Sequence, residues 1–271
     1  MTARKSFAAP FILWIIAGTV IPLISIAYYG FSSRDGGFTM SNILAIFQHD
    51  HIQALGLSLL LAVVSTLICL ILAFPMAMVL RGSKYGKQGF LIFVIILPMW
   101  MNFLLRTMAW QVLLERQGVI NSVLTAIGLP RQEMMNTPGA IILGMVYDFL
   151  PFMILPIYNT VSKIDSHLIE AAYDLGASKT QTFTKVILPL SVPGIVSGIT
   201  MVFIPALTTF VISNMLGGGK INLIGNIIEQ EFTVNSNWYL GSGLSLVMMV
   251  FIILSMLLLQ KFDKTGGQNL I

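Results

Sequence analysis

The chain has 271 residues, of which 56% are hydrophobic and only 10% are charged. A soluble domain carries about 25% charged residues, so this composition excludes an ordinary water-soluble globular enzyme. The remaining class is a protein that crosses a membrane several times, because lipid must replace water around so much apolar surface. The net charge of +4 does not indicate a nucleic-acid binder, since the basic residues occur in short groups between apolar stretches.

Six apolar stretches are each long enough for the roughly 20 residues that a helix needs to cross the hydrocarbon core. They cover residues 6–33, 52–80, 88–105, 134–162, 186–219 and 232–260, and Asp148 is the one acidic or basic residue within them. We therefore predict an all-α protein with six transmembrane helices. The first stretch exceeds the apolar part of a secretion signal, about 7 to 15 residues, so we predict that it is retained as a helix.

The distribution of Lys and Arg predicts the orientation, because cytoplasmic segments carry an excess of both. With the N-terminus inside, ten lie in inner segments: Arg4, Lys5, Arg81, Lys84, Lys87, Lys163, Lys179, Lys185, Lys261 and Lys264. Four lie in outer segments: Arg34, Arg116, Arg131 and Lys220. Both termini are therefore expected in the cytoplasm. The fifteenth, Arg106, is expected near the outer end of the third helix, either extending to the membrane surface or facing a cavity.

Two patterns predict how the helices are shaped and packed. Proline removes a backbone donor and bends helices, which predicts bends in five of the six helices, at Pro22, Pro75, Pro98, Pro151, Pro156 and Pro205. Gly194 and Gly198 form a small-residue ridge that allows close helix packing, either within this chain or against another subunit. We expect residues 1–51 to form a first helix and outer loop, 52–262 the transmembrane domain, and 263–271 a cytoplasmic tail.

The inner segment 162–185 predicts a helical hairpin. Its first helix carries one apolar stripe at helical spacing, made of Leu168, Ala171, Ala172 and Leu175. Asp165 or Ser166 is suited to cap the start of this helix, and Gly176 to end it in a left-handed conformation. Ser178 and Gln181 have the spacing of a capping box that opens a second helix running toward Pro189.

The sequence of this hairpin resembles a motif of a known family. The residues that carry it are Glu170-Ala171-Ala172, Gly176 three residues later, and Val186-Ile187-Leu188-Pro189 after nine more. This spacing resembles the EAA loop of bacterial ABC-importer permeases, with Val186 where that family usually has Ile. In that family the loop docks on the ATP-binding subunit, so the resemblance implies that Glu170, Ala171, Ala172 and Gly176 couple this chain to an ATPase. An inert amphipathic linker is the alternative.

Four further segments are similar to the PotB-like permease of spermidine/putrescine importers. They are 98–106, 150–158, 174–179 and 223–226, and the similarity extends from about Ile52 to the last helix. The resemblance implies a type I ABC-importer (MetI-like) fold in a bacterial cell membrane. It implies four kinds of partner: a homologous second permease, a dimer of ATP-binding subunits, an extracytoplasmic polyamine-binding protein and membrane lipid. ATP and Mg²⁺ would be bound by the ATPase, so this chain is expected to need no cofactor.

Neither Gly-Lys sequence of the chain is a phosphate-binding loop. Lys220 is followed by Ile221 instead of Ser or Thr, and Asn214 stands where the first glycine is required. Gly86-Lys87 fails at both corresponding positions, Arg81 and Gln88. We therefore expect no ATP hydrolysis by this chain and no enzymatic activity, and interpret 217–220 as a flexible outer turn.

No other pattern predicts catalysis or a metal site. His49 and His51 flank Asp50 without a third convincing ligand, which is more typical of solvated loop residues than of metal binding. The single cysteine, Cys69, lies in an apolar stretch, where a small buried side chain is the simplest interpretation.

Asp148 is the candidate for substrate contact, because it lies near the centre of the fourth predicted helix. A carboxylate there costs about 2.5–3.5 kcal/mol on insertion scales. One hypothesis is that it faces the translocation cavity and attracts an amine, with Tyr147, Trp100 and Trp110 offering ring faces. The alternatives are a protonated acid that donates to the Tyr147 carbonyl, and aromatic rings that only pack or lie at the membrane interface.

The sequence therefore predicts the permease subunit of an ATP-driven importer that forms the path for polyamines. One alternative is the same machine with another cargo, such as another organic cation, thiamine or ferric ion, because the hairpin carries no information about the substrate. A second alternative is a self-contained channel or ion-driven carrier.

Overall fold

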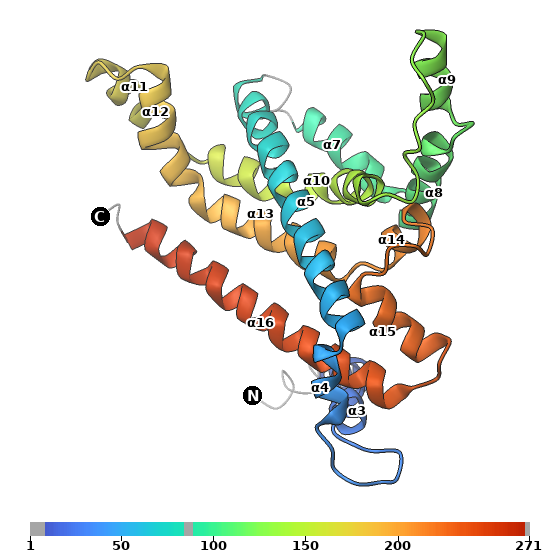
Figure 1. Cartoon of the computed structure of the whole chain (residues 1–271). Coiled ribbons are helices and arrows are strands. Elements are labelled where there is room, and N and C mark those ends of the chain that lie inside the picture. The colour runs from blue at the N-terminus through green and yellow to red at the C-terminus, as the bar shows by residue number, and fades with distance from the viewer. Residues whose placement is uncertain (1–8, 84–88, 269–271) are drawn as a thin grey trace. The chain divides into compact units, whose positions relative to one another are not determined.

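The structure is a computed structural model that describes residues 9–83 and 89–268 (Figure 1). These residues form helices and loops with no strand, as the predicted all-α class requires. Their order is α2 (Ala9–Ile15), η1 (Ile16–Val20), α3 (Ile21–Gly30), α4 (Ser41–Leu44), η2 (Ala45–Phe47), α5 (His49–Gly82), α7 (Phe90–Ile96), η3 (Leu97–Trp100), α8 (Phe103–Leu114), α9 (Val119–Ala126), α10 (Pro138–Val161), α11 (Ser166–Asp174), α12 (Lys179–Thr182), η4 (Phe183–Ile187), α13 (Leu188–Thr208), α14 (Val211–Leu216), α15 (Ile224–Thr233) and α16 (Trp238–Gln268).

The described residues divide into two compact units. The first combines the chain before Gly56 with Ile224–Ile253, and the second combines Gly56–Leu223 with the end of α16. In the first unit an aromatic cluster joins α3 to α16, because the ring of Tyr29 lies 6.3 Å from Trp238 and 5.6 Å from Tyr239. Gly243 of α16 permits close contact with the segment at Asn42, whose atoms lie 2.6 Å from where a Cβ would be.

α10 is the central helix of the second unit. Gly194 and Gly198 of α13 face it so closely that a Cβ would lie 2.5 Å from Thr160 Oγ1 and 2.6 Å from Met153 Sδ, respectively. The glycine ridge of the sequence therefore packs within this chain. On the side of α5, the Cys69 thiol donates to the Val146 carbonyl at 3.8 Å. Cys69 is fully buried, as its apolar surroundings predicted.

Within the described residues, five helices are long and apolar enough to cross a membrane. They are Pro10–Gly30, His49–Gly82, Pro138–Val161, Lys179–Thr208 and Trp238–Lys261. A sixth span results if Phe90–Trp100 and Phe103–Ala126, which meet at an angle of 86°, count as one broken span. The predicted number of six therefore depends on that pair.

The third predicted helix, 88–105, is not continuous. Pro98 lies in the 3₁₀ turn η3, Met101 is extended, and α8 starts afresh with the Asn102 side chain accepting a hydrogen bond from Leu104 N at 2.8 Å. A residue with its own capping side chain directly after a proline turn favours a new helix over continuation. The fifth predicted span, 186–219, is also interrupted, because Thr209 is extended and α14 is separate.

Two prolines follow widened turns of π-helix. Before Pro22 the Ile21 N–H bonds to Ile16 O, and before Pro189 the Leu188 N–H bonds to Phe183 O, in each case five residues back. A wider turn tolerates the absence of the proline N–H donor. It also leaves room for the proline ring, which would otherwise clash with the preceding turn. Pro75, Pro151, Pro156 and Pro205 lie inside continuous α-helices.

Some predicted limits fall on residues outside the described ranges. These are the start of the first span at residue 6, the start of the third at residue 88, the Gly86-Lys87 site and the last residues of the predicted tail. The rest of that tail is helical, because α16 continues to Gln268.

Candidate functional site

The helical hairpin between α10 and α13 has the predicted local structure. The Asp165 carboxylate accepts a hydrogen bond from His167 N at 3.0 Å and so caps α11. Gly176 ends the helix with φ +81°, a left-handed conformation that glycine adopts without steric cost. The Ala177 N–H then bonds to Ala172 O, closing the last turn.

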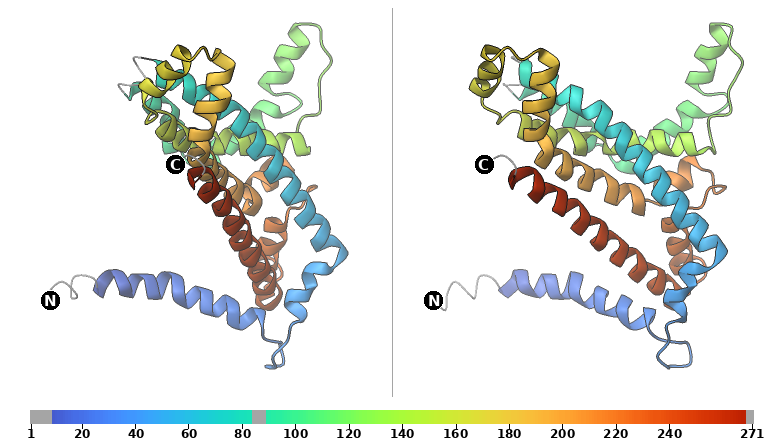
Figure 2. Two further views of the ribbon diagram at one scale, coloured as in Figure 1. Left: turned by 90° about the vertical axis from the view of Figure 1, so that its left-hand side faces the viewer. Right: turned by 60° about the vertical axis from the view of Figure 1, so that its left-hand side comes forward.

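The second arm of the hairpin begins with the predicted capping box. The Ser178 hydroxyl accepts from Gln181 N at 3.3 Å, and the Gln181 side chain accepts from Ser178 N at 2.8 Å. From there α12, η4 and α13 follow without a break, so the helix passes Pro189 and ends only at Thr208. The hairpin is thus continuous with a helix that is long and apolar enough to cross a membrane (Figure 2).

Several apolar side chains of α11 are exposed to solvent. Leu175 is 89% exposed, and Leu168 and Tyr173 are about half exposed at 50% and 46%. Ala171 is exposed beside Leu168 and Leu175 on one helical stripe, while Ala172 is partly covered. Glu170 lies at the surface, 3.5 Å from the His167 ring. A short helix that shows an apolar stripe to solvent has a surface suited to contact with another molecule.

Both arms of the hairpin are anchored to the end of α5. The Arg81 guanidinium donates to the Ile164 carbonyl at 2.9 Å, just before α11. The Phe74 ring packs edge-on against Phe183 of η4, with 5.5 Å between centroids. α5 therefore holds the hairpin in addition to the two helices that the hairpin connects.

A second candidate site lies between α8 and α10, where an ion pair is buried. Arg106 Nη1 lies 3.3 Å from Asp148 Oδ1, and the two residues are only 7% and 1% exposed. The Thr107 hydroxyl contacts Asp148 Oδ2 at 3.4 Å. Asp148 thus has a cationic partner, and Arg106 does not extend to the surface.

The ion pair is poorly hydrogen-bonded. Arg106 Nε, Arg106 Nη1 and Asp148 Oδ1 are buried and form no hydrogen bond within the described part of the chain. Removing one partner of a buried pair costs about 3–5 kcal/mol, because the other charge is left uncompensated. The loss of either charge alone is therefore unfavourable.

The structure brings three of the four predicted path residues together. Trp110 and Tyr147 form an edge-on ring pair with 5.4 Å between centroids, joining the same helices as the ion pair. Trp100 instead packs on Phe93, at 5.8 Å, and is 75% exposed. The pairing of Arg106 with Asp148 was not predicted from the sequence. The available signal was that each is the only charged residue of its apolar helix.

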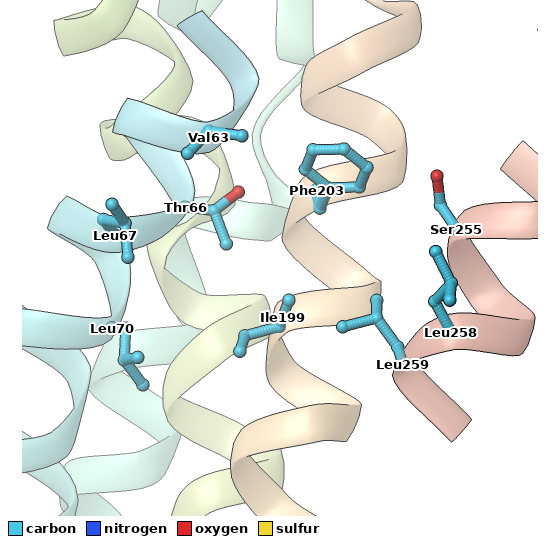
Figure 3. A pocket seen from close by; sticks show the side chains of 9 residues that line it. All are labelled: Val63, Thr66, Leu67, Leu70, Ile199, Phe203, Ser255, Leu258 and Leu259. Carbon is cyan, nitrogen blue, oxygen red and sulfur yellow. The ribbon is translucent and has the colours of Figure 1, made fainter. Parts of the chain in front are cut away.

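An apolar cavity elsewhere in the second unit has no group that suits a cation. It has a volume of about 300 Å³, and α5, α13 and the end of α16 line it (Figure 3). Its lining is aliphatic apart from Phe203, Thr66 and Ser255, and the Thr66 hydroxyl already donates to Ala62 O at 2.6 Å. Without a carboxylate, this cavity is better suited to hydrocarbon than to a charged solute.

The remaining sequence candidates make local contacts. The His51 ring is buried and bonds through Nδ1 to Ala45 O at 2.6 Å, while the His49 ring contacts the Gln53 amide at 2.9 Å. No group of three or more His, Cys, Asp or Glu suited to a metal occurs within 9–83 and 89–268. The glycine turn at 217–220 packs against the segment before α10, since the Asn136 amide occupies the space where Gly218 would carry a Cβ.

The fold and these sites define a helical protein with several candidate membrane spans and a helical hairpin whose apolar side chains are exposed. Residues 73–265 match the family of binding-protein-dependent transport system inner membrane components. The chain is 35% identical to the spermidine/putrescine transport system permease protein PotB of Haemophilus influenzae, over 96% of this chain and 94% of that protein. It is 36% identical to the Escherichia coli protein of the same name, over 88% of this chain and 89% of that protein.

A solved structure agrees in fold. It is a bacterial alginate ABC transporter in complex with its pentasaccharide-bound periplasmic protein, with a TM-score of 0.80 at 17% identity, over 97% of this chain and 94% of that chain. The chain belongs to the family of binding-protein-dependent transport system inner membrane components. It is accordingly a multi-pass inner-membrane permease subunit and not an enzyme.

Proposed function

We propose that this chain forms the translocation path of an ATP-driven importer for polyamines, spermidine or putrescine. The observation that carries the proposal is the joint presence of two features. The hairpin resembles the EAA loop in sequence and is a capped helical pair with exposed apolar side chains, and relatives named for spermidine/putrescine transport align over almost the whole chain. The hairpin supports an ABC importer, and the relatives support the cargo.

The proposal includes partners that this chain does not itself supply. A homologous permease would complete the path, a pair of ATP-binding subunits would dock on Glu170, Ala171, Ala172 and Gly176, and a binding protein outside the membrane would deliver the polyamine. ATP and Mg²⁺ would be held by the ATPase pair. With the hairpin in the cytoplasm, both termini lie on the same side.

The mechanism follows from how the hairpin is attached. Closure of the ATPase pair displaces α11, and the continuous helix from Lys179 to Thr208 carries that displacement into the membrane. Asp148 of α10 and the Trp110–Tyr147 ring pair lie on the path, where a carboxylate and ring faces favour a polycation over neutral solutes. This chain supplies the path and the coupling, while hydrolysis takes place on its partner.

Reconstitution tests the function directly. Proteoliposomes that contain the chain, its sister permease, the ATPase and the binding protein should accumulate labelled spermidine only with ATP. The chain reconstituted alone should move no solute. Solute movement by the chain alone, without ATP, would instead establish a channel or an ion-driven carrier.

Competition tests the cargo. Unlabelled putrescine should reduce spermidine uptake, whereas thiamine, ferric ion and unrelated organic cations should not. ATP-driven uptake of one of these in place of spermidine would retain the importer and reject the polyamine.

A further inference from the structure

Within the described residues, the polar partners of the Asp148 carboxylate come from one neighbouring helix, α8. Arg106 and Thr107 are adjacent residues of α8, and the Trp110 ring, one turn further along α8, packs against Tyr147. If α8 moves away from α10, the carboxylate loses its cation and its hydrogen-bond donor together. The position of α8 relative to α10 therefore decides whether the Asp148 charge is neutralised.

α8 begins at a natural hinge. It follows an 86° bend, with Met101 extended and Asn102 outside the helix as its cap. Non-helical residues between two helices absorb rotations of the backbone while each helix stays intact. A rotation at Met101 would carry Arg106, Thr107 and Trp110 away from α10 together.

We propose that Arg106 is an internal substitute for the ammonium group of the substrate. It neutralises Asp148 while α8 and α10 are together, and a substrate ammonium takes its place when α8 moves. The inference rests on the proposed function, in which Asp148 lies on the path of an organic polycation. The pair is suited to exchange, because Asp148 Oδ1 and two guanidinium nitrogens form no hydrogen bond that would hold them.

Selectivity follows from this exchange. A buried carboxylate without a counter-ion is strongly unfavourable, so α8 separates from α10 readily only when a cation is available. An ammonium group has three donors and no acceptor, which suits it to the oxygens that Arg106 and Thr107 release. A neutral or anionic solute cannot compensate the charge.

Equilibrium binding of spermidine to the membrane complex in nanodiscs, without the binding protein, tests the competition. R106Q removes the internal cation. This variant should bind spermidine about tenfold more tightly, because no guanidinium competes with spermidine for the Asp148 carboxylate. The double variant R106Q/D148N should lose this gain. The control R116Q changes an arginine whose pair with Glu133 is exposed, and it should bind as the unsubstituted complex does. An assembled R106Q complex that binds no more tightly, or a double variant that keeps the gain, would overturn the inference.

Spermidine uptake by the R106M/D148L variant tests the exchange at Asp148 independently of how well R106Q folds. Apolar replacement of a buried ion pair is commonly neutral or stabilising for folding, so this variant should assemble and hydrolyse ATP. A pair with only a structural role predicts normal spermidine uptake, whereas the inference predicts that uptake is lost. Normal uptake would reject the role of the pair and leave the importer intact. The proposed function fails separately, if the unsubstituted complex takes up no spermidine with ATP.

Discussion

At the scale of single residues, the most informative position is Asp148, because burial and charge conflict there. Its carboxylate is 1% exposed, and the interactions that compensate it come from α8. A residue that only packed would be less costly as Asn or Leu, since neither needs a counter-ion. The charge is therefore the property to test.

We predict that D148N reduces spermidine uptake about tenfold per assembled complex, with assembly measured separately because the substitution leaves the Arg106 charge buried without its partner. A hydrogen bond to a charged group is worth about 1.5–3 kcal/mol, and the amide retains acceptance from Thr107 but loses attraction for an ammonium. Uptake rates in proteoliposomes measure the effect, and D35N in an exposed loop is the matched control. Unchanged kinetics would remove Asp148 from the substrate path.

Gly194 offers a second residue-scale prediction, about stability. A Cβ there would lie 2.8 Å from the Pro156 carbonyl, a backbone atom that cannot turn aside. Overpacking of this kind costs about 1–3 kcal/mol, so G194A should lower the melting temperature of the purified complex. G139A is the control, because its nearest neighbour is 3.7 Å away. Equal melting temperatures for the two variants would contradict the tight α10–α13 contact.

At the scale of elements, the hairpin is attached to three of the candidate membrane-spanning helices. These attachments are the end of α10, the start of α13, and α5 through Arg81 and Phe74. Local sequence determines the hairpin, since its caps and glycine stop involve residues two to five apart. The attachment to α5 joins residues 83 apart in the chain and follows no local pattern.

We predict that R81M lowers spermidine uptake several-fold while ATP hydrolysis continues. The substitution removes the hydrogen bond to Ile164 O, worth about 1.5–3 kcal/mol for a charged donor, so the hairpin moves without α5. Parallel assays of ATPase and uptake on the reconstituted complex separate the two activities. R81K keeps the positive charge that helps to orient the helix, and it should retain more uptake than R81M. A parallel loss of both activities would indicate faulty assembly instead.

At the scale of the whole molecule, the predicted orientation places the hairpin in the cytoplasm and the α15–α16 loop outside. Leu175 and Val234 are 89% and 74% exposed, whereas the native Cys69 is fully buried. In intact cells, a membrane-impermeant thiol reagent should therefore label V234C and leave L175C unlabelled. Both should react after the membrane is opened. Labelling of L175C in intact cells would reverse the topology.

Composition and local pattern determined several properties without any tertiary information. The scarcity of charge required a membrane, the length of the apolar stretches predicted the spans, and the side chains at 165–181 predicted caps that the structure confirms. These features depend on residues close together in the chain and on the solvent around it. Sequence reasoning succeeds there because the physical causes are equally local.

Only the tertiary structure decided which distant residues meet. It paired Arg106 with Asp148, packed Gly194 on α10 and joined Arg81 to the hairpin. Each of these depends on how one helix lies against another, and many packings satisfy the same apolar pattern. A buried charge reveals its partner only when the fold has brought the two helices together.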